Sequence, residues 1–215
     1  MRITALLPAG ERARPIRFGI ARGARMSIDF HRGQTRLYLG LYECELNRTI
    51  RRLAPHGTPS FDLGGEYGYD ALALARLTGA PVVSVECVPE LCETIRSNAA
   101  LNPRLAPLIT VRQAFIGAGA GQLSLDELTQ STFVPGFVKM DIEGGEVEAL
   151  EGATDLLRAG RPSLLVEVHG KAAEVACLAI LRAASYDVKT VDTRSWLPDH
   201  RPIDHNRWLV AVPGR

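Results

Sequence analysis

An α/β fold with a mostly parallel sheet of seven strands is predicted by three features of this 215-residue sequence. From Thr58 onward, short apolar runs alternate with segments of helical periodicity, which is the order of βαβ units. Most of these runs are continuously apolar, as is typical of strands covered by helices on both faces of a parallel sheet. The last two runs follow each other without a helix between them, so we expect them to form an antiparallel pair at one side of the sheet.

The predicted elements follow one another regularly along the chain. Strands are expected at residues 60–63, 82–86, 108–112, 137–141 and 163–169, with the final pair at 186–191 and 207–212. Helices are expected at residues 69–77, 89–101, 146–159 and 171–184. Pro89 suits the first turn of the second helix, and Gly160 can end the third.

The first 55 residues stand outside this alternation, so we expect a cap at residues 1–55, on the carboxyl edge of the sheet, and the α/β domain at residues 56–215. A hairpin is expected between residues 25–30 and 35–39, and residues 43–53 have helical character. The cap holds eleven arginines and four acids, a net charge of 11 − 4 = +7, so the remainder carries 1 − 7 = −6. This basic region either faces an anionic acceptor or partner or is an exposed, solvated surface.

Membrane, secreted and zinc-binding classes are not expected. No run approaches the roughly 20 apolar residues of a membrane span, and the N-terminus lacks the pattern of a signal peptide, so we expect a cytoplasmic protein. The cysteines lack C-x-x-C spacing and are expected to be reduced thiols at positions Cys44, Cys87, Cys92 and Cys177.

A glycine turn follows the first predicted strand, in the segment FDLGGEYG at residues 61–68. The turn begins with Asp62, and the next predicted strand ends in Glu86. In open parallel sheets ligands bind at the carboxyl ends of the strands, where both acids are expected. The glycines are expected to let a ligand approach the backbone, although a tight turn that binds nothing would also use them: Gly64, Gly65 and Gly68.

Glu66 indicates which ligand suits this turn. A dinucleotide site requires glycine at this position, because the backbone must make room for a pyrophosphate, and Glu66 would place negative charge beside it. An NAD-type oxidoreductase is therefore disfavoured. The turn suits the cationic S-adenosylmethionine, because Asp62 can serve its amino group and Glu86 can accept both ribose hydroxyls. Cys87 and Val88 would then flank the adenine.

A second motif, VKMDIEGGE at residues 138–146, closes the fourth predicted strand and opens a helix. Together with the 61–68 turn, Glu86 and the Glu167-x-His169 pair, it resembles the FkbM-type S-adenosylmethionine-dependent methyltransferase family over roughly residues 38–170. The resemblance implies a Rossmann-like class I methyltransferase fold and S-adenosylmethionine as the cofactor. It also implies methylation of a hydroxyl on a sugar, polyketide or other small metabolite.

The same resemblance implies which residues contact the cofactor. Asp141 belongs to the second motif, and Glu43 ends the segment LGLYE at residues 39–43, which resembles the entry into the domain in that family. Glu66 belongs to the glycine turn, although the family commonly has asparagine there. Cofactor-binding roles are therefore expected for Glu43, Glu66 and Asp141.

Methylation of an alcohol also removes a proton, so a base is expected within hydrogen-bond reach of the acceptor. His169 is the first choice, because histidine titrates near neutral pH. Asp141 ends the neighbouring strand and could hold the acceptor or the amino group of the cofactor. An ordinary position at a strand end would also explain His169.

Other polar residues of the second motif have structural explanations. Lys139 alternates with apolar neighbours and is expected to pair with an acid such as Glu167. Glu146, like Glu143, falls in the first turn of a helix, where the dipole alone favours acids. No metal is expected, although Asp141, Glu167 and His169 could hold a divalent ion, because oxygen ligands suit magnesium.

The sequence therefore favours an enzyme with a small-molecule or glycan acceptor and without a nucleic-acid or membrane partner; a homodimer is compatible with it. The alternative is a non-catalytic module that binds the cofactor and uses its basic N-terminus to bind an anionic partner.

Overall fold

The computed structural model describes residues 10–191 and 206–214. Arg2 and the polar connection between the last two predicted strands lie outside the described residues. Within those ranges, no helix is long and apolar enough to cross a membrane.

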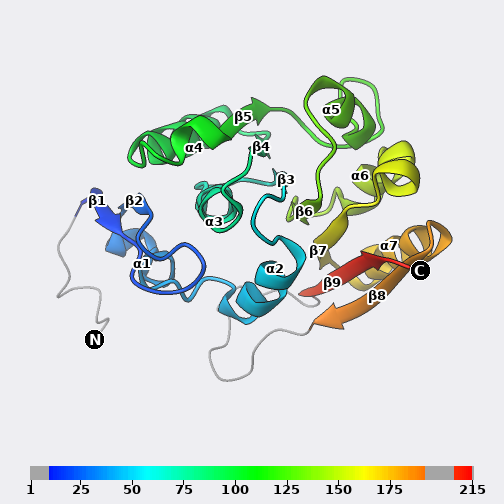
Figure 1. Ribbon diagram of the computed structural model, residues 1–215, viewed down its shortest axis with the longest axis horizontal. Coiled ribbons are helices and arrows are strands. Elements are labelled where there is room, and N and C mark those ends of the chain that lie inside the picture. Colours follow the sequence, from blue (N-terminus) through cyan, green and yellow to red (C-terminus); the bar gives the residue numbers. More distant parts are fainter. Residues whose placement is uncertain (1–9, 192–205, 215) are drawn as a thin grey trace.

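The larger sheet confirms the predicted architecture. Its strands lie in the order β5-β4-β3-β6-β7-β9-β8, and the first five are parallel (Figure 1). β9 runs antiparallel to both β7 and β8. The bounds are β3 (Ser60–Leu63), β4 (Val82–Glu86), β5 (Ile109–Gln113), β6 (Phe137–Met140), β7 (Ser163–His169), β8 (Tyr186–Val191) and β9 (Asn206–Pro213). The order reverses beside β3, so the ends of β3 and β6 frame the position where such sheets bind ligands.

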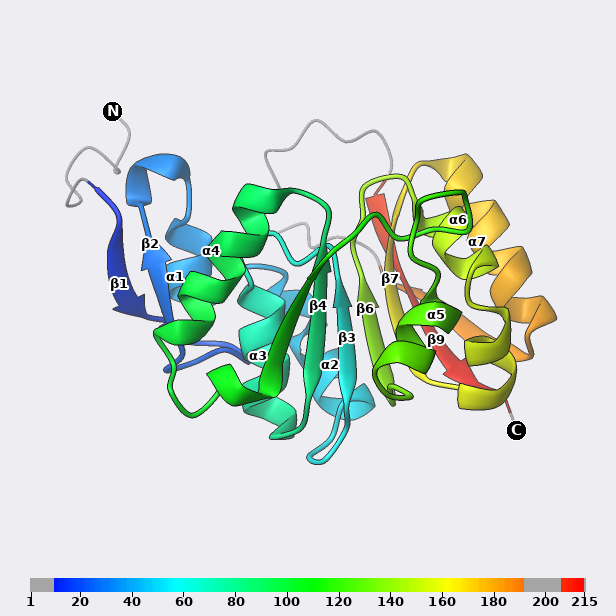
Figure 2. The same ribbon diagram turned by 90° about the horizontal axis from the view of Figure 1, so that it is seen from above.

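Helices cover both faces of this sheet (Figures 1 and 2). α3 (Tyr69–Thr78) packs on one face, and α5 (Leu125–Ser131), α6 (Glu146–Glu151) and α7 (Lys171–Ala183) pack on the other. α4 (Pro89–Ala100) lies beside β4 and β5. Successive strand residues alternate between the two cores, as a pleated strand requires: Leu164 faces α5–α7, and Leu165 faces α3.

The N-terminal segment differs from the expected hairpin. Arg25–Ile28 forms β2, which pairs antiparallel with β1 (Arg12–Pro15) in a separate two-stranded sheet. Thr35–Leu39 is not a strand but helix α1. Gly40 ends α1 with φ 69°, a left-handed conformation that glycine adopts without strain. The prediction of a hairpin between residues 25–30 and 35–39 is therefore wrong.

Residues 44–53 are helical as expected, with a 3₁₀ turn at Cys44–Leu46 followed by α2 (Asn47–Leu53). Met26 and Ile50 of the N-terminal segment lie in the same buried core as Leu72 of α3. The segment therefore packs on the face of the sheet that α3 covers.

Two buried asparagines, Asn98 in α4 and Asn102 just after it, attach β2 to the rest of the molecule. The side chain of Asn102 accepts from the N–H of Arg25 (2.7 Å) and donates to its carbonyl (2.8 Å). Asn98 accepts from the N–H of Ser27 (2.8 Å) and donates to the carbonyl of Tyr67 in the glycine turn (2.9 Å). Side-chain amides thus replace a neighbouring strand along this edge of β2.

The region between β5 and β7 differs from the prediction in two places. α5 was not expected, although Ser124 and Glu127 form a reciprocal capping box at its start. The helix expected at residues 146–159 stops at Glu151 and is followed by a π-helical turn at Leu156–Gly160.

Candidate active site

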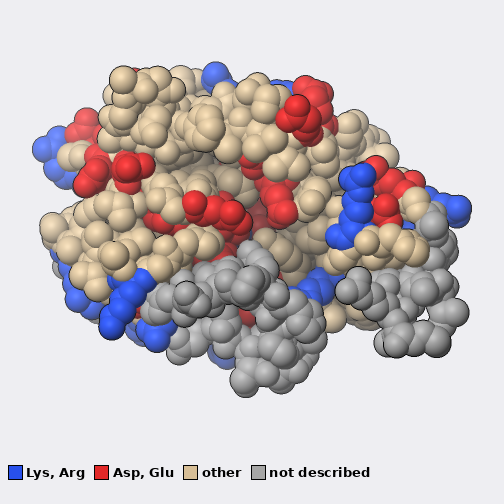
Figure 3. Space-filling model, turned by 180° about the vertical axis from the view of Figure 1, so that it is seen from behind, with Lys and Arg blue, Asp and Glu red and all other residues tan. Residues whose placement is uncertain are grey.

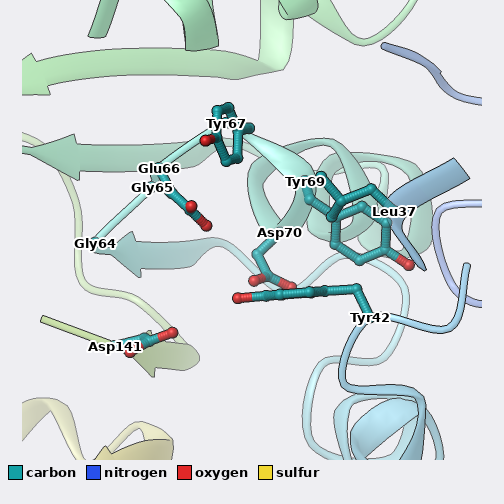
Figure 4. A pocket seen from close by; sticks show the side chains of 9 residues that line it. All are labelled: Leu37, Tyr42, Gly64, Gly65, Glu66, Tyr67, Tyr69, Asp70 and Asp141. Atoms are coloured by element: carbon teal, nitrogen blue, oxygen red, sulfur yellow. The ribbon is translucent and has the colours of Figure 1, made fainter. Parts of the chain in front are cut away.

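A hollow lies at the carboxyl ends of the central strands, and acidic side chains gather in it (Figure 3). In Figure 4 the side chains of Glu66, Asp70 and Asp141 turn toward the same space from three sides. The N-terminal segment closes part of the hollow with Leu37 and Tyr42. The residues that line it are Leu37, Tyr42, Gly64, Gly65, Glu66, Tyr67, Tyr69, Asp70 and Asp141. Predicted site residues from both motifs therefore meet in one place.

The glycine turn is shaped by the protein itself. A Cβ on Gly64 would lie 1.7 Å from the backbone oxygen of Asp141, and one on Gly65 would lie 2.3 Å from the Ser84 hydroxyl. Gly68 has φ 79° and lies against Ile95. The glycines are therefore needed for packing between strand ends, which is a different reason from the ligand approach that we expected.

We expect Gly64→Ala to lower the free energy of unfolding by about 2–6 kcal/mol, combining overpacking with a strained backbone. The φ of Gly64 is 86°, and its Cβ would overlap backbone that cannot rotate away. Gly121→Ala is the matched control, because Gly121 has φ 79° but no atom within 4 Å of its Cβ position. Urea unfolding measures both, and equal losses in the two variants would contradict the role of the contact with Asp141.

Glu86 is held at the end of β4 by two backbone donors. Its Oε2 accepts from the N–H of Glu66 (3.0 Å), and its Oε1 accepts from the N–H of Val88 (2.9 Å). Glu66 has φ 44°, which turns its N–H toward this carboxylate. Oε1 also accepts from the Cys87 thiol (3.5 Å), and Oε2 retains capacity for one of the predicted ribose hydroxyls. Burial and the Glu86 carboxylate raise the pKa of Cys87.

Asp62 lies beneath the glycine turn rather than on the surface of the hollow. Its side chain is buried, and Oδ2 accepts from the Ser84 hydroxyl (2.8 Å). Burial raises the pKa of Asp62 to about 7, and the nearby Asp70 carboxylate adds to this effect. A contact with the amino group of the cofactor remains a prediction for this residue.

The raised pKa makes the contribution of Asp62 to stability depend on pH. A carboxyl group whose pKa rises on folding stabilises the folded state less as the pH climbs from the unfolded value of about 4 to the folded value. That window ends at about pH 7 here. We therefore expect the stability advantage of the wild type over Asp62→Asn to shrink between pH 5 and pH 8. Urea unfolding at both pH values measures it, with the exposed Asp187→Asn as control; a constant advantage would contradict the expectation.

Lys139 is the buried cation of the site, and its ammonium contacts three acids. Nζ lies 3.1 Å from Asp70, 3.3 Å from Glu43 and 3.6 Å from Asp141. Burial lowers the pKa of Lys139, but these carboxylates outweigh it and hold the pKa well above its usual value. Burial in turn raises the pKa of Glu43. The sequence predicted an ion pair of Lys139 with an acid such as Glu167, whereas its partners in the structure are Glu43, Asp70 and Asp141.

Glu43 and Asp70 therefore have a structural role as ion-pair partners of Lys139. Glu43 has φ 40°, and it reaches Lys139 across 96 positions of sequence. Asp70 lies in the first turn of α3 and belongs to neither motif. No spacing in the sequence connects Asp70 with Lys139, so sequence reasoning missed this residue.

His169 is oriented by a buried acid that the sequence explained as a helix-dipole residue. Its Nδ1 lies 2.6 Å from Oε1 of Glu146, which also accepts from the N–H of Gly144 (2.9 Å). This hydrogen bond raises the pKa of His169 and outweighs the effect of burial. The other ring nitrogen, Nε2, lies 3.7 Å from Asp141 and 3.8 Å from Glu167. Nε2 is itself buried, so an acceptor hydroxyl could reach it only after a side-chain movement.

Acids outnumber bases around the hollow. Among the residues that the structure describes, the nearby cations are Lys139 and His169, the latter only when protonated. The buried or half-buried acids are Glu43, Asp62, Asp70, Glu86, Asp141, Glu146 and Glu167. Such an excess of negative charge favours a ligand that carries positive charge.

Comparison with known families agrees with the second motif. Residues 119–201 match the family model described as Methyltransferase FkbM domain. This stretch covers less than half of the chain and includes the VKMDIEGGE motif and His169. The resemblance to the FkbM family is confirmed there. No curated protein matches the sequence.

Solved structures share the fold at low sequence identity. A methyltransferase FkbM from Methylobacillus flagellatus KT is 21% identical with a TM-score of 0.57, and the match covers 72% of this chain and 43% of that one. An S-adenosylmethionine-dependent O-methyltransferase from Thermotoga maritima is 14% identical with a TM-score of 0.58, covering 80% and 65%. Trm5b from Pyrococcus abyssi is 12% identical with a TM-score of 0.62, covering 97% and 57%. The chain thus spans less than two thirds of each of these three, and the likeness confirms the fold class alone.

Proposed function

Because residues 119–201 match a methyltransferase FkbM domain, we propose that this protein transfers the methyl group of S-adenosylmethionine to a hydroxyl oxygen of a sugar, polyketide or other small metabolite. The observation that carries the proposal is the acid-rich hollow at the end of β3, with the glycine turn on one side and Glu86 behind it. S-adenosylmethionine has a sulfonium and an ammonium group, so its charge complements this site.

The cofactor assignment follows from the positions of the polar groups. Glu86 accepts the ribose hydroxyls, because its carboxylate is already fixed by two backbone donors. Cys87 and Val88 follow it and flank the adenine. Asp62 and Asp141 serve the amino group from below and beside the glycine turn.

The reaction is an in-line displacement at carbon. The acceptor oxygen forms a bond to the methyl carbon as the bond from that carbon to sulfur breaks, which leaves S-adenosylhomocysteine. The hydroxyl proton passes to a base, for which we propose His169 once a side-chain movement exposes Nε2. Most of the acceleration then comes from holding the two reactants in line. We place the acceptor between Asp141 and the N-terminal segment, where Leu37 and Tyr42 line the hollow. Residues 1–55 would thus form the acceptor side, and residues 56–215 the methyltransferase domain.

Calorimetric titration with S-adenosylmethionine and S-adenosylhomocysteine tests the cofactor assignment. We expect saturable binding of both, with a stoichiometry of one per chain. Nicotinamide fluorescence on addition of NADH is the control for a dinucleotide site, and we expect no change in it. If neither adenosyl ligand binds at millimolar concentration, the proposed function is wrong. Methyl transfer from labelled cofactor to hydroxylated or aminated acceptors then distinguishes oxygen from nitrogen as the acceptor atom.

A further inference from the structure

Three potential metal ligands of two chemical kinds meet beside the hollow. Asp141 follows β6, and both Glu167 and His169 lie in β7. One ligand atom from each of these side chains lies within 4.8 Å of the other two. The distances from Nε2 of His169 to the carboxylate oxygens are 3.7 Å and 3.8 Å, which are too long for hydrogen bonds. Adjacent ligands on one ion are about 3 Å apart when the bonds are 2.0–2.1 Å, so a small movement would bring all three onto a common ion.

Two of the atoms that face this space have no other partner. Nε2 of His169 and Oδ1 of Asp141 are buried and form no hydrogen bond with any described residue. A buried polar atom without a partner destabilises the folded state. An ion between these atoms would give both of them a partner.

Glu146 already holds the imidazole as a metal-bound histidine is usually held. Its side chain is completely buried, and the hydrogen bond at 2.6 Å fixes the proton on Nδ1. When the ring is neutral, the lone pair of Nε2 lies on the side of Asp141 and Glu167, where a cation could be shared between the three groups. Metal-bound histidines commonly donate their second N–H to a carboxylate in this way.

The local charge also calls for a cation. Asp141, Glu146 and Glu167 surround the His169 ring, and Lys139 reaches only Asp141 at 3.6 Å among these three acids. We infer that Asp141, Glu167 and His169 form a site for one divalent cation of the Mg²⁺ or Mn²⁺ type. Two carboxylates favour these oxygen-seeking ions, and one imidazole is compatible with Mn²⁺.

The site itself does not depend on the proposed function, but its use in catalysis rests on it. A cation beside Asp141 would polarise an acceptor hydroxyl and lower its pKa, which is the task that the sequence analysis gave to His169. His169 would then be a ligand instead of the base. This role agrees with the buried position of Nε2, which a base acting directly on the acceptor does not have.

Titration of the metal-free protein with Mn²⁺ tests the inference without S-adenosylmethionine or turnover. Electron paramagnetic resonance counts the free ion, and calorimetry gives the affinity. We expect one saturable Mn²⁺ per chain, and competition by Mg²⁺. His169→Gln should abolish saturation, and Glu146→Gln should weaken binding by about 10- to 100-fold. His31→Gln is the matched control, because His31 is exposed and lies in the N-terminal segment.

Circular dichroism melts check that each variant is folded before it is titrated. If Glu146→Gln does not fold, His169→Gln alone decides, because its side chain is partly exposed. Absence of saturable binding in the wild type up to millimolar Mn²⁺ would overturn the site, as would equal affinity in wild type and His169→Gln. Binding of S-adenosylmethionine in the absence of Mn²⁺ together with either result would leave the proposed function standing while the metal site fails.

Discussion

Replacing Lys139 by methionine is expected to lower the free energy of unfolding by about 3–5 kcal/mol, because removal of one partner leaves buried charges uncompensated. Its side chain is only 3% exposed, and its ammonium lies within 3.6 Å of Glu43, Asp70 and Asp141. Methionine fills a similar volume, so the loss reports charge more than packing. Urea unfolding at neutral pH measures the change.

Lys189→Met is the matched control, since Lys189 is exposed on β8, and it should change stability by no more than about 0.5 kcal/mol. A double variant with Glu43→Gln provides a sharper test. Removing one of the three uncompensated acids should recover part of the loss, so the two changes should not add. Strict additivity, or a loss similar to that of the control, would show that Lys139 does not neutralise this cluster.

Glu86→Gln is expected to weaken the binding of S-adenosylmethionine by about 10- to 100-fold, because hydrogen bonds to a charged group contribute about 1.5–3 kcal/mol. Glutamine has one acceptor oxygen, whereas Glu86 uses both oxygens for the N–H groups of Glu66 and Val88. Its amide nitrogen would face one of these donors, so the substitution disturbs the turn as well as the ribose contact. Calorimetric titration measures the affinity.

The control for this experiment is Glu90→Gln, an exposed acid in the first turn of α4. It carries the same change of charge four positions further along the chain and should leave the affinity unchanged. Thermal melts with and without ligand separate a loss of binding from a loss of folding. An affinity in Glu86→Gln equal to that of the wild type would remove the assignment of Glu86 to the ribose.

The parallel strands were predictable because burial on both faces of the sheet determines their sequences. Residues of β3, β4 and β7 are buried on both faces, so their apolar runs have the same bounds in sequence and structure. The N-terminal segment lacks such runs. β1 is only partly buried and contains two arginines. Thr35–Leu39 contains Thr35 and Tyr38, which are residue types that favour strands, although it forms a helix. Only its ending at Gly40 indicates the helix.

The site was predictable to the extent that its residues lie in two local motifs. Asp62, Glu86 and Asp141 were found because parallel strands bring their carboxyl ends to one edge. The residues that pair with Lys139 and His169 were not predicted, because these pairs join segments that are distant in the sequence. Asp70 meets Lys139 from a different helix, and the pairing of Glu146 with His169 depends on how α6 begins over the end of β7. The preference for acids at the start of a helix already explained Glu146, so nothing in the sequence indicated its contact with His169.

The amide of Asn98 ties the two sides of the hollow into one mechanical unit. It holds Ser27 of β2 through one atom and Tyr67 of the glycine turn through another. A displacement of the N-terminal segment therefore pulls on the same turn in which Glu66 donates its N–H to Glu86. The N-terminal segment and the glycine turn are therefore expected to move together rather than independently.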